Sequence, residues 1–495
     1  MKTFNELNVP TRHWMIKSMQ WADQNWNNEL SLIRIPVDHE KQSITARNQN
    51  GEEDVRNSIW YATGLLMRQN PADVKRALKI IDAVLKYQFD DPEKVFHGTF
   101  YRNPSESYPP EDPIQWDHYD PNWREFICTV FIVLITEFQE VIPKNLIDRM
   151  NHSIMLAAQG SYERQVSPEY TNISLMSTFL LDFAGRQFNN NEWKQYALNL
   201  GREIHRLFER NKTFNEFNSP TYYGVDFYAL ALWRKYGSST EYQNLGNSME
   251  LDLWRDVAQF YHAEMRNLCG PYDRSYGMDM QNYIASVGLW ISTIVPVELA
   301  PLPDTDQPFN HSGDYYFFPM VALLETNIPN ETVTHFKEFQ GEKFLSRTIE
   351  PKRTASSWLS ENLMLGTESN LLSTERPKHL SNQFHPATAH WFTSGGNLAW
   401  LSCKSNNPLN INCSPNVISL SSSNNESCEY IFEINAPNIS PSMVDPYLWR
   451  FPGMTISLKR TNTPFFIKHF ENQLTIQFSA DGIVELTFEP SDNEK

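Results

Sequence analysis

A helix-start pattern recurs along the first two thirds of the chain at intervals of about 50 residues. Four apolar runs follow proline-bearing segments, namely Asp120-Pro121-Asn122-Trp123, Ser167-Pro168-Glu169-Tyr170, Ser219-Pro220-Thr221-Tyr222 and Gly270-Pro271-Tyr272-Asp273. A Ser or Asp side chain can cap a helix, and proline fits the first helical position. Amphipathic stretches near 143–158, 191–210 and 242–268 fill the intervals. A buried helix followed by an amphipathic one, repeated, predicts stacked helical hairpins.

Two further segments extend the repeat. An apolar run from Asp54 to Arg68 precedes the series, and Ser312-Gly313-Asp314-Tyr315 follows it. Together these starts predict about six buried helices, which can close into an α/α toroid. The interval 292–311 has no room for an outer helix, so an N-terminal helix near 10–29 is expected to occupy that position. The alternative is an open helical solenoid without a common pocket.

The sequence changes character after about Asn327. Short β-branched or aromatic runs appear at Val417–Leu420, Tyr430–Ile434, Met454–Leu458, Phe465–Phe470, Leu474–Phe478 and Ile483–Phe488. Such runs predict an antiparallel β-sandwich, with turns at Ser421–Glu426 and Asp481-Gly482. The expected fold class is therefore α+β, with a toroidal catalytic domain over 1–327 and a sandwich over 328–495.

Composition limits the partners and the compartment. The net charge of −17 argues against nucleic acid or an anionic membrane as a partner. The five cysteines contain no CxxC pair and are expected to be reduced thiols. The sequence has neither the apolar run of a signal peptide nor that of a membrane span, so we expect a cytoplasmic protein. A Gly-rich phosphate loop, GxSxG and HExxH are absent, so no cofactor or metal is expected. The oligomeric state is left open.

Parallel inner helices would bring their first turns to one mouth of the toroid. The polar and aromatic residues at these starts are Asn122, Trp123, Glu125, Tyr170, Asn172, Glu216, Asn218, Tyr222, Tyr223, Asp226, Tyr272, Asp273, Arg274, Tyr276, His311, Asp314 and Tyr315. Taken together they indicate a pocket for a polar ligand with flat apolar faces, such as a sugar. The alternative is that the rings only staple the helix ends.

The segment 91–119 is expected to border the same mouth. Nearly thirty residues without a helical period are unusual inside a compact domain and are often functional. Its candidate binding residues are His97, Tyr101, Arg102, Trp116 and His118. Both histidines can titrate near neutral pH, although each could equally be a structural hydrogen-bonding group. In the second domain His385, His390, Trp391 and Arg376 are candidates for a far wall of the cleft or for a structural linker.

An α/α toroid followed by an antiparallel β-sandwich resembles the polysaccharide lyases of the heparinase, chondroitin lyase and alginate lyase type. The resemblance is one of architecture and covers nearly the whole chain. It implies β-elimination from a uronic acid in an oligosaccharide, in which Asn, His or Arg neutralises the carboxylate and Tyr or His removes a proton. Asn218 or Asn172 with Arg274 could neutralise, and Tyr222, Tyr223 or Tyr276 could be the base, helped by His118.

The expected site residues fall into two groups. The catalytic candidates are Tyr222, Tyr223, Asn218, Asp273, Arg274, Tyr276, His118 and Glu216. The substrate-binding candidates are Trp123, Asn122, Tyr170, Asn172, Asp226, His97, Tyr101, Arg102 and Trp116.

Three other functions fit the same residues. An inverting glycoside hydrolase needs two carboxyls about 6.5–9.5 Å apart; its candidates are Glu216, Asp226, Asp273, Asp279, Glu125 and Asp117. A terpenoid cyclase or dehydratase would use aromatic rings to stabilise a cation, with Trp60, Trp116, Trp123, Tyr222 and Trp290 as candidates. A non-catalytic carbohydrate-binding protein is the last alternative.

Overall fold

The computed structural model describes residues 3–36, 51–307, 309–370, 383–405, 407–422, 427–461 and 464–491. The chain divides into two compact units. The first, called the helical unit, comprises Met1–Glu209, Tyr222–Asp252 and Gln281–Ile328. The second, called the sheet unit, comprises Arg210–Thr221, Leu253–Met280 and Pro329–Lys495. The chain therefore passes between the units several times.

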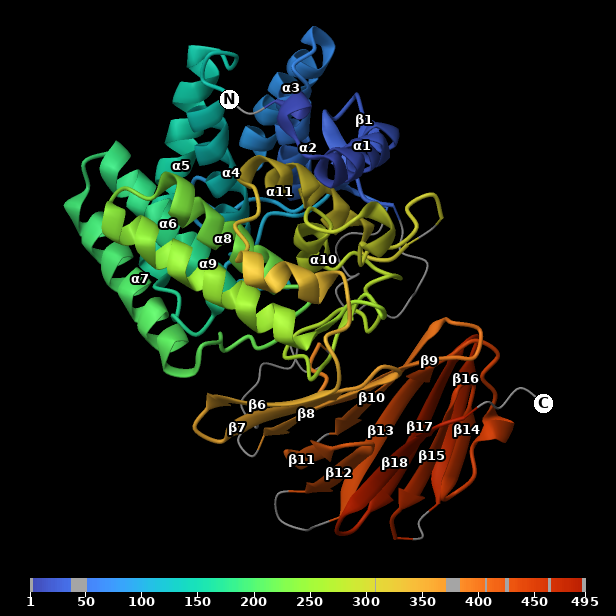
Figure 1. The fold of residues 1–495 in the computed structure, drawn as a ribbon. Coiled ribbons are helices and arrows are strands. Elements are labelled where there is room, and N and C mark those ends of the chain that lie inside the picture. The colour runs from blue at the N-terminus through green and yellow to red at the C-terminus, as the bar shows by residue number, and fades with distance from the viewer. Residues whose placement is uncertain are drawn as a thin grey trace. The chain divides into compact units, whose positions relative to one another are not determined.

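The helical unit is a ring of paired helices that follow one another in chain order (Figure 1). Its elements are α1 (Val9–Gln24), α2 (Val55–Arg68), α3 (Pro71–Val84), α4 (Trp123–Glu137), α5 (Lys144–Arg164), α6 (Thr171–Gln187), α7 (Asn191–Asn211), α8 (Tyr223–Tyr236), α9 (Thr240–Phe260), α10 (Ser286–Ile291), the 3-10 helix η5 (Ser312–Phe317) and α11 (Phe318–Leu324). The last residues of α7 and α9, from Arg210 and from Leu253, belong to the sheet unit. The inner elements α2, α4, α6, α8 and α10 each pack against the next, and η5 contacts both α10 and α2. The ring is therefore closed, as predicted.

The burial patterns separate inner from outer helices. Every residue of α6 from Thr171 to Gly185 is buried, as in a helix surrounded by other helices. In α7 the buried residues are Ala197, Leu200, Gly201, Ile204 and Phe208, which form one stripe at helical spacing. The outer helix thus buries one face and exposes the other.

Helix α1 occupies the outer position for which the segment 292–311 has no helix of its own. It packs against α11, η5 and α2. The Ser18 hydroxyl donates to the Tyr315 carbonyl at 2.9 Å, and the Lys17 ammonium pairs with Asp306 at 2.8 Å. The expectation for the N-terminal helix is confirmed.

The predicted helix starts were wrong in detail. Helix α8 begins at Tyr223 rather than at Pro220, and the Ser219 hydroxyl donates to the Arg274 carbonyl instead of capping the helix. The segment from Gly270 begins no helix, because its backbone groups bond to other segments. Tyr272 and His385 exchange backbone hydrogen bonds of 3.2 and 2.9 Å. The fifth inner helix is α10, which starts at Ser286.

The sheet unit contains a β-sandwich. Its strands are β6 (Lys343–Glu350), β7 (Arg353–Leu359), β8 (Leu363–Asn370), β9 (Ala387–Phe392), β10 (Leu398–Ser405), β11 (Leu409–Ser414), β12 (Val417–Ser422), β13 (Cys428–Asn435), β14 (Leu448–Phe451), β15 (Met454–Lys459), β16 (Phe465–Phe470), β17 (Gln473–Ala480) and β18 (Val484–Pro490). Among the described residues one sheet has the order β16-β17-β13-β10-β9-β8-β7-β6 and the other β11-β12-β18-β15-β14, with antiparallel pairing.

Five of the six predicted β-runs lie wholly in strands, and the sixth, Ile483–Phe488, lies in β18 except for Ile483. Strand β13 alternates strictly between buried and half-buried residues, which is the pattern of a sheet with one face in a core. Trp391, Phe432, Trp449 and Phe478 are among the residues that fill that core. Asp481-Gly482 joins β17 to β18, strands of different sheets, with Gly482 at φ 75°. Residues 423–426 of the other predicted turn, and Arg376, lie outside the described residues.

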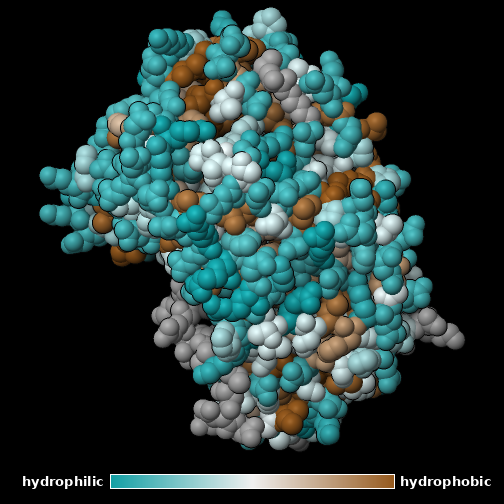
Figure 2. All heavy atoms as spheres, turned by 60° about the vertical axis from the view of Figure 1, so that its left-hand side comes forward, coloured by the Kyte–Doolittle hydropathy of each residue, from teal (hydrophilic) through white to brown (hydrophobic). Residues whose placement is uncertain are grey.

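The surface and the cysteines agree with the composition. On the face that Figure 2 shows, hydrophilic residues predominate and hydrophobic residues form small separate patches. In the described part of the chain no helix is long and apolar enough to cross a membrane. All five cysteines are free and buried.

We expect Asp54 to make folding stability depend on pH. Asp54 caps α2 by accepting a hydrogen bond from the Asn57 amide at 2.6 Å, and burial raises the pKa of its carboxyl from 3.8 to about 6. A raised folded-state pKa gives stability that is complete below pH 4 and is lost as the pH rises through 6. In the variant Asp54→Asn the side-chain amide can still cap α2, but it does not titrate. The stability of the wild type relative to Asp54→Asn should therefore fall by up to about 3 kcal/mol between pH 4 and 7, as measured by denaturant unfolding. A pH-independent difference would contradict this assignment.

Candidate functional site

The starts of neighbouring inner elements meet at one end of the helical unit. The Asn122 amide, just before α4, donates to the Tyr170 hydroxyl, just before α6, at 3.0 Å. The Trp290 indole of α10 donates to the Gly224 carbonyl at the start of α8, at 2.8 Å. Tyr283 and His311, which precede α10 and η5, have ring centroids 5.9 Å apart. This end is called the mouth below.

Aromatic side chains fill the middle of the ring. Trp60 of α2 packs edge-on against Phe317 of η5, with ring centroids 4.9 Å apart. The Tyr228 hydroxyl of α8 lies 2.8 Å from the Thr129 hydroxyl of α4. Side chains of α2, α4, α8 and η5 thus contact one another within the ring.

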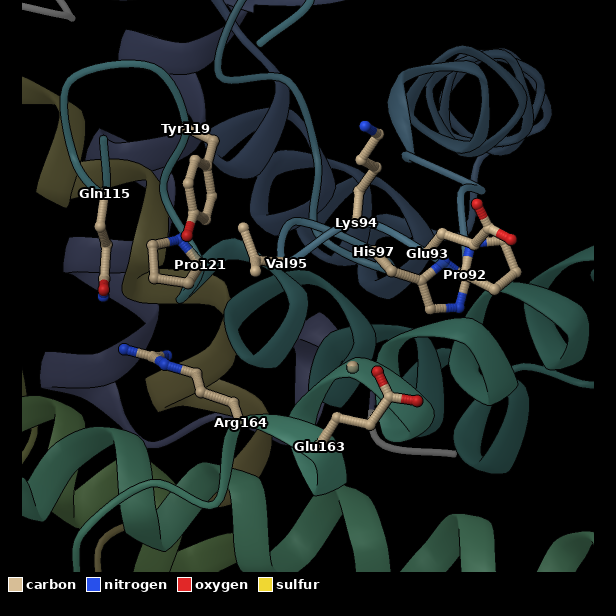
Figure 3. Close-up of a pocket in the computed structure, with 11 residues that line it drawn as sticks. Pro92, Glu93, Lys94, Val95, His97, Gln115, Tyr119, Pro121, Glu163 and Arg164 are labelled. Atoms are coloured by element: carbon tan, nitrogen blue, oxygen red, sulfur yellow. The ribbon is translucent and has the colours of Figure 1, made fainter. Parts of the chain in front are cut away.

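A pocket of about 400 Å³ lies where the segment 91–119 meets the start of α4 and the end of α5 (Figure 3). It is lined by Pro92, Glu93, Lys94, Val95, His97, Gln115, Tyr119, Pro121, Gly160, Glu163 and Arg164. In Figure 3, Gln115, Tyr119 and Arg164 lie on one side, whereas Glu93, His97 and Glu163 lie on the other. Because α5 is followed directly by α6, the last turn of α5 lies at the mouth.

His97 gives the pocket a buried hydrogen-bond donor. The side chain is 1% exposed, and its Nδ1 accepts a hydrogen bond from the Asp91 amide at 3.1 Å. Nε2 must therefore carry the proton in the neutral ring, and in the described residues it has no hydrogen-bond partner. A buried donor of this kind calls for an acceptor, which a ligand oxygen or a water in the pocket can supply.

Arg164, Asn122 and Tyr170 form a hydrogen-bonded chain beside the pocket. The Arg164 guanidinium donates to the Asn122 side-chain oxygen at 2.8 Å, and Asn122 in turn donates to the Tyr170 hydroxyl. Burial raises the pKa of Tyr119 across the pocket, and the charges of Arg124 and Arg164 partly offset the rise. A guanidinium, an amide and a phenol are thus aligned where two inner helices start.

A buried carboxyl lies in the first turn of α4. Glu125 is fully buried, and neither of its oxygens has a hydrogen-bond partner in the described residues. Burial raises its pKa, although Arg124 and Arg164 act in the opposite direction. Glu125 is therefore biased towards the neutral acid.

The other predicted residues of the segment 91–119 largely hold it together. The buried Arg102 donates to the carbonyls of Trp116 at 3.0 Å and Asp117 at 2.9 Å and pairs with Glu106 at 2.5 Å. His118 accepts from the Ile114 amide at 2.8 Å. The Tyr101 ring packs on Phe89 with centroids 4.0 Å apart. Of the predicted residues in this segment, His97 lines the pocket.

Four predicted catalytic residues meet in the sheet unit. Glu216 pairs with Arg274, and the Arg274 Nε also donates to Gln383 at 3.0 Å. The Asn218 side chain donates to the carbonyls of Cys269 at 2.7 Å and Pro271 at 2.9 Å. These contacts join the segments 214–221 and 269–274 into one buried polar cluster.

Asp273, the fourth of these residues, joins a second buried ion-pair group. Its carboxylate pairs with Arg353 at 3.0 Å, and Arg353 also pairs with the fully buried Glu368 at 2.9 Å. The carboxylates raise the pKa of Arg353 despite its burial. This group ties the segment from Gly270 to strands β7 and β8.

The predicted site residues are thus divided between the units. The helical unit holds Tyr222, Tyr223, Asp226, Asn172 and His118, whereas the sheet unit holds Glu216, Asn218, Asp273, Arg274 and Tyr276. Tyr222 and Tyr276 are half-buried, and Tyr223 is fully buried. The catalytic roles of these residues stay predictions.

Sequence reasoning missed Lys94, Tyr119, Glu163 and Arg164, which line the pocket. Tyr119 follows His118 directly, so the segment was right but the residue was not named. Arg164 ends an outer helix, where a basic residue is usually explained by the helix dipole. Arg164 differs from other basic residues at helix ends only because the last turn of α5 lies beside the start of the next inner helix.

Comparison with known proteins identifies the family but no activity. The chain belongs to the family described as Domain of unknown function (DUF8769), which matches residues 12–326. Residues 339–462 match Domain of unknown function (DUF8770). No curated protein matches the chain.

Several solved structures align with much of the chain at low identity and low TM-score. An unsaturated glucuronyl hydrolase mutant from Streptococcus agalactiae is 14% identical, with 70% of this chain and 86% of that chain covered and a TM-score of 0.35. Heparinase III is 10% identical, with 97% and 85% covered and a TM-score of 0.32. Heparan sulfate lyase HepC from Pedobacter heparinus is 10% identical, with 92% of each chain covered and a TM-score of 0.22. TM-scores this low carry no conclusion about this chain.

Gly160 is expected to be essential for the wall of the pocket. A Cβ at this position would lie 2.2 Å from the His97 carbonyl oxygen and 2.3 Å from an Arg124 nitrogen. Gly160→Ala should therefore lower the free energy of unfolding by about 1–3 kcal/mol. Gly395→Ala is the control, because its nearest neighbour would be 3.4 Å away. Equal effects in denaturant unfolding would contradict the packing described.

Arg353 is expected to stabilise the sheet unit. Arg353→Met would remove the positive charge that pairs with the buried carboxylates of Asp273 and Glu368, which costs about 3–5 kcal/mol. The exposed pair Arg450–Asp445, with N···O 3.1 Å, provides the control, because Arg450→Met should cost less than about 1 kcal/mol. Thermal unfolding of both variants tests the difference. If Arg353→Met lowered the melting temperature as little as Arg450→Met, the buried ion-pair group would not be needed for the stability of the sheet unit.

Proposed function

We propose that the protein is a carbohydrate-active enzyme that cleaves a uronate-containing oligosaccharide by β-elimination at the mouth of the helical unit. The observation that carries the proposal is a pair of hydrogen bonds beside the pocket, from Arg164 to Asn122 and from Asn122 to Tyr170. They link a guanidinium, an amide and a phenol, which are the three groups that this reaction needs.

The proposed chemistry follows from those groups. The Arg164 guanidinium can bind the sugar carboxylate by paired hydrogen bonds, and the Asn122 amide can add a further donor. Neutralising the carboxylate makes the proton on the adjacent ring carbon, C5, more acidic. The Tyr170 phenolate removes that proton and becomes a neutral phenol, a double bond forms between C4 and C5, and the bond from C4 to the glycosidic oxygen breaks. The departing oxygen takes its proton from the Tyr170 hydroxyl, which regenerates the phenolate.

Other groups around the pocket fit an acidic sugar. The buried Nε2–H of His97 can donate to a substrate hydroxyl or carboxylate. Lys94 and Arg164 supply two positive charges to the pocket, which Glu93 and Glu163 on its walls match, and the chain as a whole carries −17. This global charge opposes a long polyanion, so a short oligosaccharide is the substrate proposed. Tyr222, half-buried before α8, is the alternative base at the same mouth.

Inverting hydrolysis is the second candidate. It requires one protonated and one ionised carboxyl, and the raised pKa of the buried Glu125 suits the proton donor. Glu163 on the pocket wall is exposed and could activate water. The full burial of Glu125 counts against direct contact with a substrate, so this function ranks below elimination.

The test is an assay that distinguishes the two reactions. Oligosaccharides from alginate, pectate, chondroitin and heparosan are incubated with the protein, together with neutral oligosaccharides. Elimination raises the ultraviolet absorbance of unsaturated uronates, whereas hydrolysis releases reducing ends without it. We expect the absorbance to rise with at least one uronate substrate. Reducing ends alone would favour the hydrolase. The absence of both signals would overturn both candidate functions for this panel.

Matched variants locate the base. Tyr170→Phe should lower kcat by about 10²–10⁴-fold while the melting temperature stays nearly unchanged. Tyr162→Phe is the control, because the Tyr162 hydroxyl on α5 donates to Glu192 at 2.6 Å outside the pocket. Tyr222→Phe and Asp273→Asn test the residues predicted from the sequence. Full activity of Tyr170→Phe with loss in Tyr222→Phe would move the base to α8.

A further inference from the structure

Two exposed aromatic side chains alternate with a lysine along β16, the edge strand of the larger sheet. Phe466 is 71% exposed and Phe470 is 65% exposed, and Lys468 between them is also exposed. Single exposed apolar side chains are common on protein surfaces, so the arrangement of these rings on the sheet decides whether they can form a binding surface. The helical unit and its pocket do not account for them.

The strand register shows which side chains share this face. Phe465 and Ile467 lie opposite the buried Phe478 and Ile476 of β17, so they face the core. Phe466, Lys468 and Phe470 therefore point to the other side of the sheet, opposite Gln477, Thr475 and Gln473. The same rows continue through Ile431, Glu433 and Asn435 of β13 to Lys404 and the half-buried Trp400 of β10. Ser402, between these two on β10, is fully buried, and its hydroxyl lies 2.8 Å from His385 Nδ1. The eleven positions other than Ser402 are called the outer face.

The aromatic side chains of the outer face are widely spaced. Phe466 and Phe470 are four residues apart on one strand, which corresponds to about 14 Å. Trp400 lies in the same row as Phe470 but three strands away, again about 14 Å. Amide and hydroxyl side chains of Gln473, Thr475 and Asn435 occupy positions between the rings. Such spacing suits an extended ligand rather than a single small molecule.

The charges of the outer face largely cancel. Lys404 pairs with Glu433 at 3.0 Å. On the same face the Gln477 amide donates to Glu429 of β13 at 2.7 Å. The two lysines are thus matched by two glutamates. The face therefore offers stacking surfaces and hydrogen-bonding groups without a strong electrostatic preference.

We propose that the outer face binds a neutral polysaccharide chain, separately from the pocket of the helical unit. A pyranose ring presents apolar C–H faces, which stack on aromatic rings, and a rim of hydroxyls, which bond to amides and hydroxyls. The outer face supplies both kinds of group in rows. This site is independent of the proposed elimination reaction, because it uses none of the residues at the mouth.

A second copy of the chain is the competing occupant, since an edge strand can pair with another edge strand. Antiparallel pairing of two β16 strands centred on Lys468 would place two lysines directly opposite each other. Like charges in that position destabilise a strand pair. The lysine thus disfavours self-association and leaves the rings available to an uncharged ligand.

The test is affinity electrophoresis of the full chain in native gels that contain hydroxyethylcellulose, barley β-glucan, xylan, galactomannan or alginate. We expect at least one neutral polysaccharide to retard the protein. The double variant Phe466→Ala/Phe470→Ala should weaken this binding at least tenfold, and Trp400→Ala, on another strand, should also weaken it. Phe344→Ala is the control, because Phe344 is 51% exposed on the opposite edge strand, β6.

Each outcome decides the proposal. Retardation that the Phe466/Phe470 and Trp400 variants lose, and that Phe344→Ala and Tyr170→Phe keep, supports a separate binding face. Absence of retardation by all five polysaccharides, binding to alginate alone, or retardation unchanged in the variants overturns it. Sedimentation of the wild type as a dimer and of the double variant as a monomer, without retardation, assigns the face to a second copy instead.

Discussion

The helical unit depends on the closure of its inner ring. Helices such as α4 and α6 are buried along almost their whole length, so neither can be stable with one partner alone. Each inner element needs a neighbour on both sides, and the contact of η5 with both α10 and α2 supplies the last of these. Closure also brings the unpaired N–H groups of successive helix starts to one end. The position of the mouth therefore follows from the packing of the ring.

The regular part of the fold could be predicted from the sequence because its signals are local. Apolar runs of helical length and short alternating strands gave the toroid and the sandwich, including α1 in the outer position. The fifth inner helix was misplaced, since Gly270-Pro271-Tyr272-Asp273 has the same local signals as the true starts. Its backbone instead pairs with His385, more than one hundred residues away, and no local pattern contains that contact.

The candidate site shows the same limit. Asn122 and Tyr170 were named from the sequence because polar residues at helix starts stand out, and His97 because it lies in the long segment 91–119. Arg164 was not, because a basic residue at the end of an outer helix has an ordinary explanation. Glu216, Asn218, Tyr222 and Asp226 were expected at one mouth of the toroid. Glu216 and Asn218 instead belong to the sheet unit, and Tyr222 and Asp226 belong to the helical unit. These residues are neighbours in sequence, but the boundary between the two units is defined by contacts between residues far apart in the chain.

The interleaving of the two units has a consequence for folding during synthesis. Residues 210–221 and 253–280 leave the ribosome before the strands to which they bond. The partners of Asp273, Tyr272 and Met278 are synthesised later in the chain, namely Arg353, His385 and His390. At translation rates of about 5–20 residues per second, these polar segments wait several seconds or longer for their partners. The last inner elements of the helical ring are also synthesised while the segments 210–221 and 253–280 still lack their partner strands. The units are therefore not interchangeable modules, and neither can be transplanted to another chain as a single continuous piece.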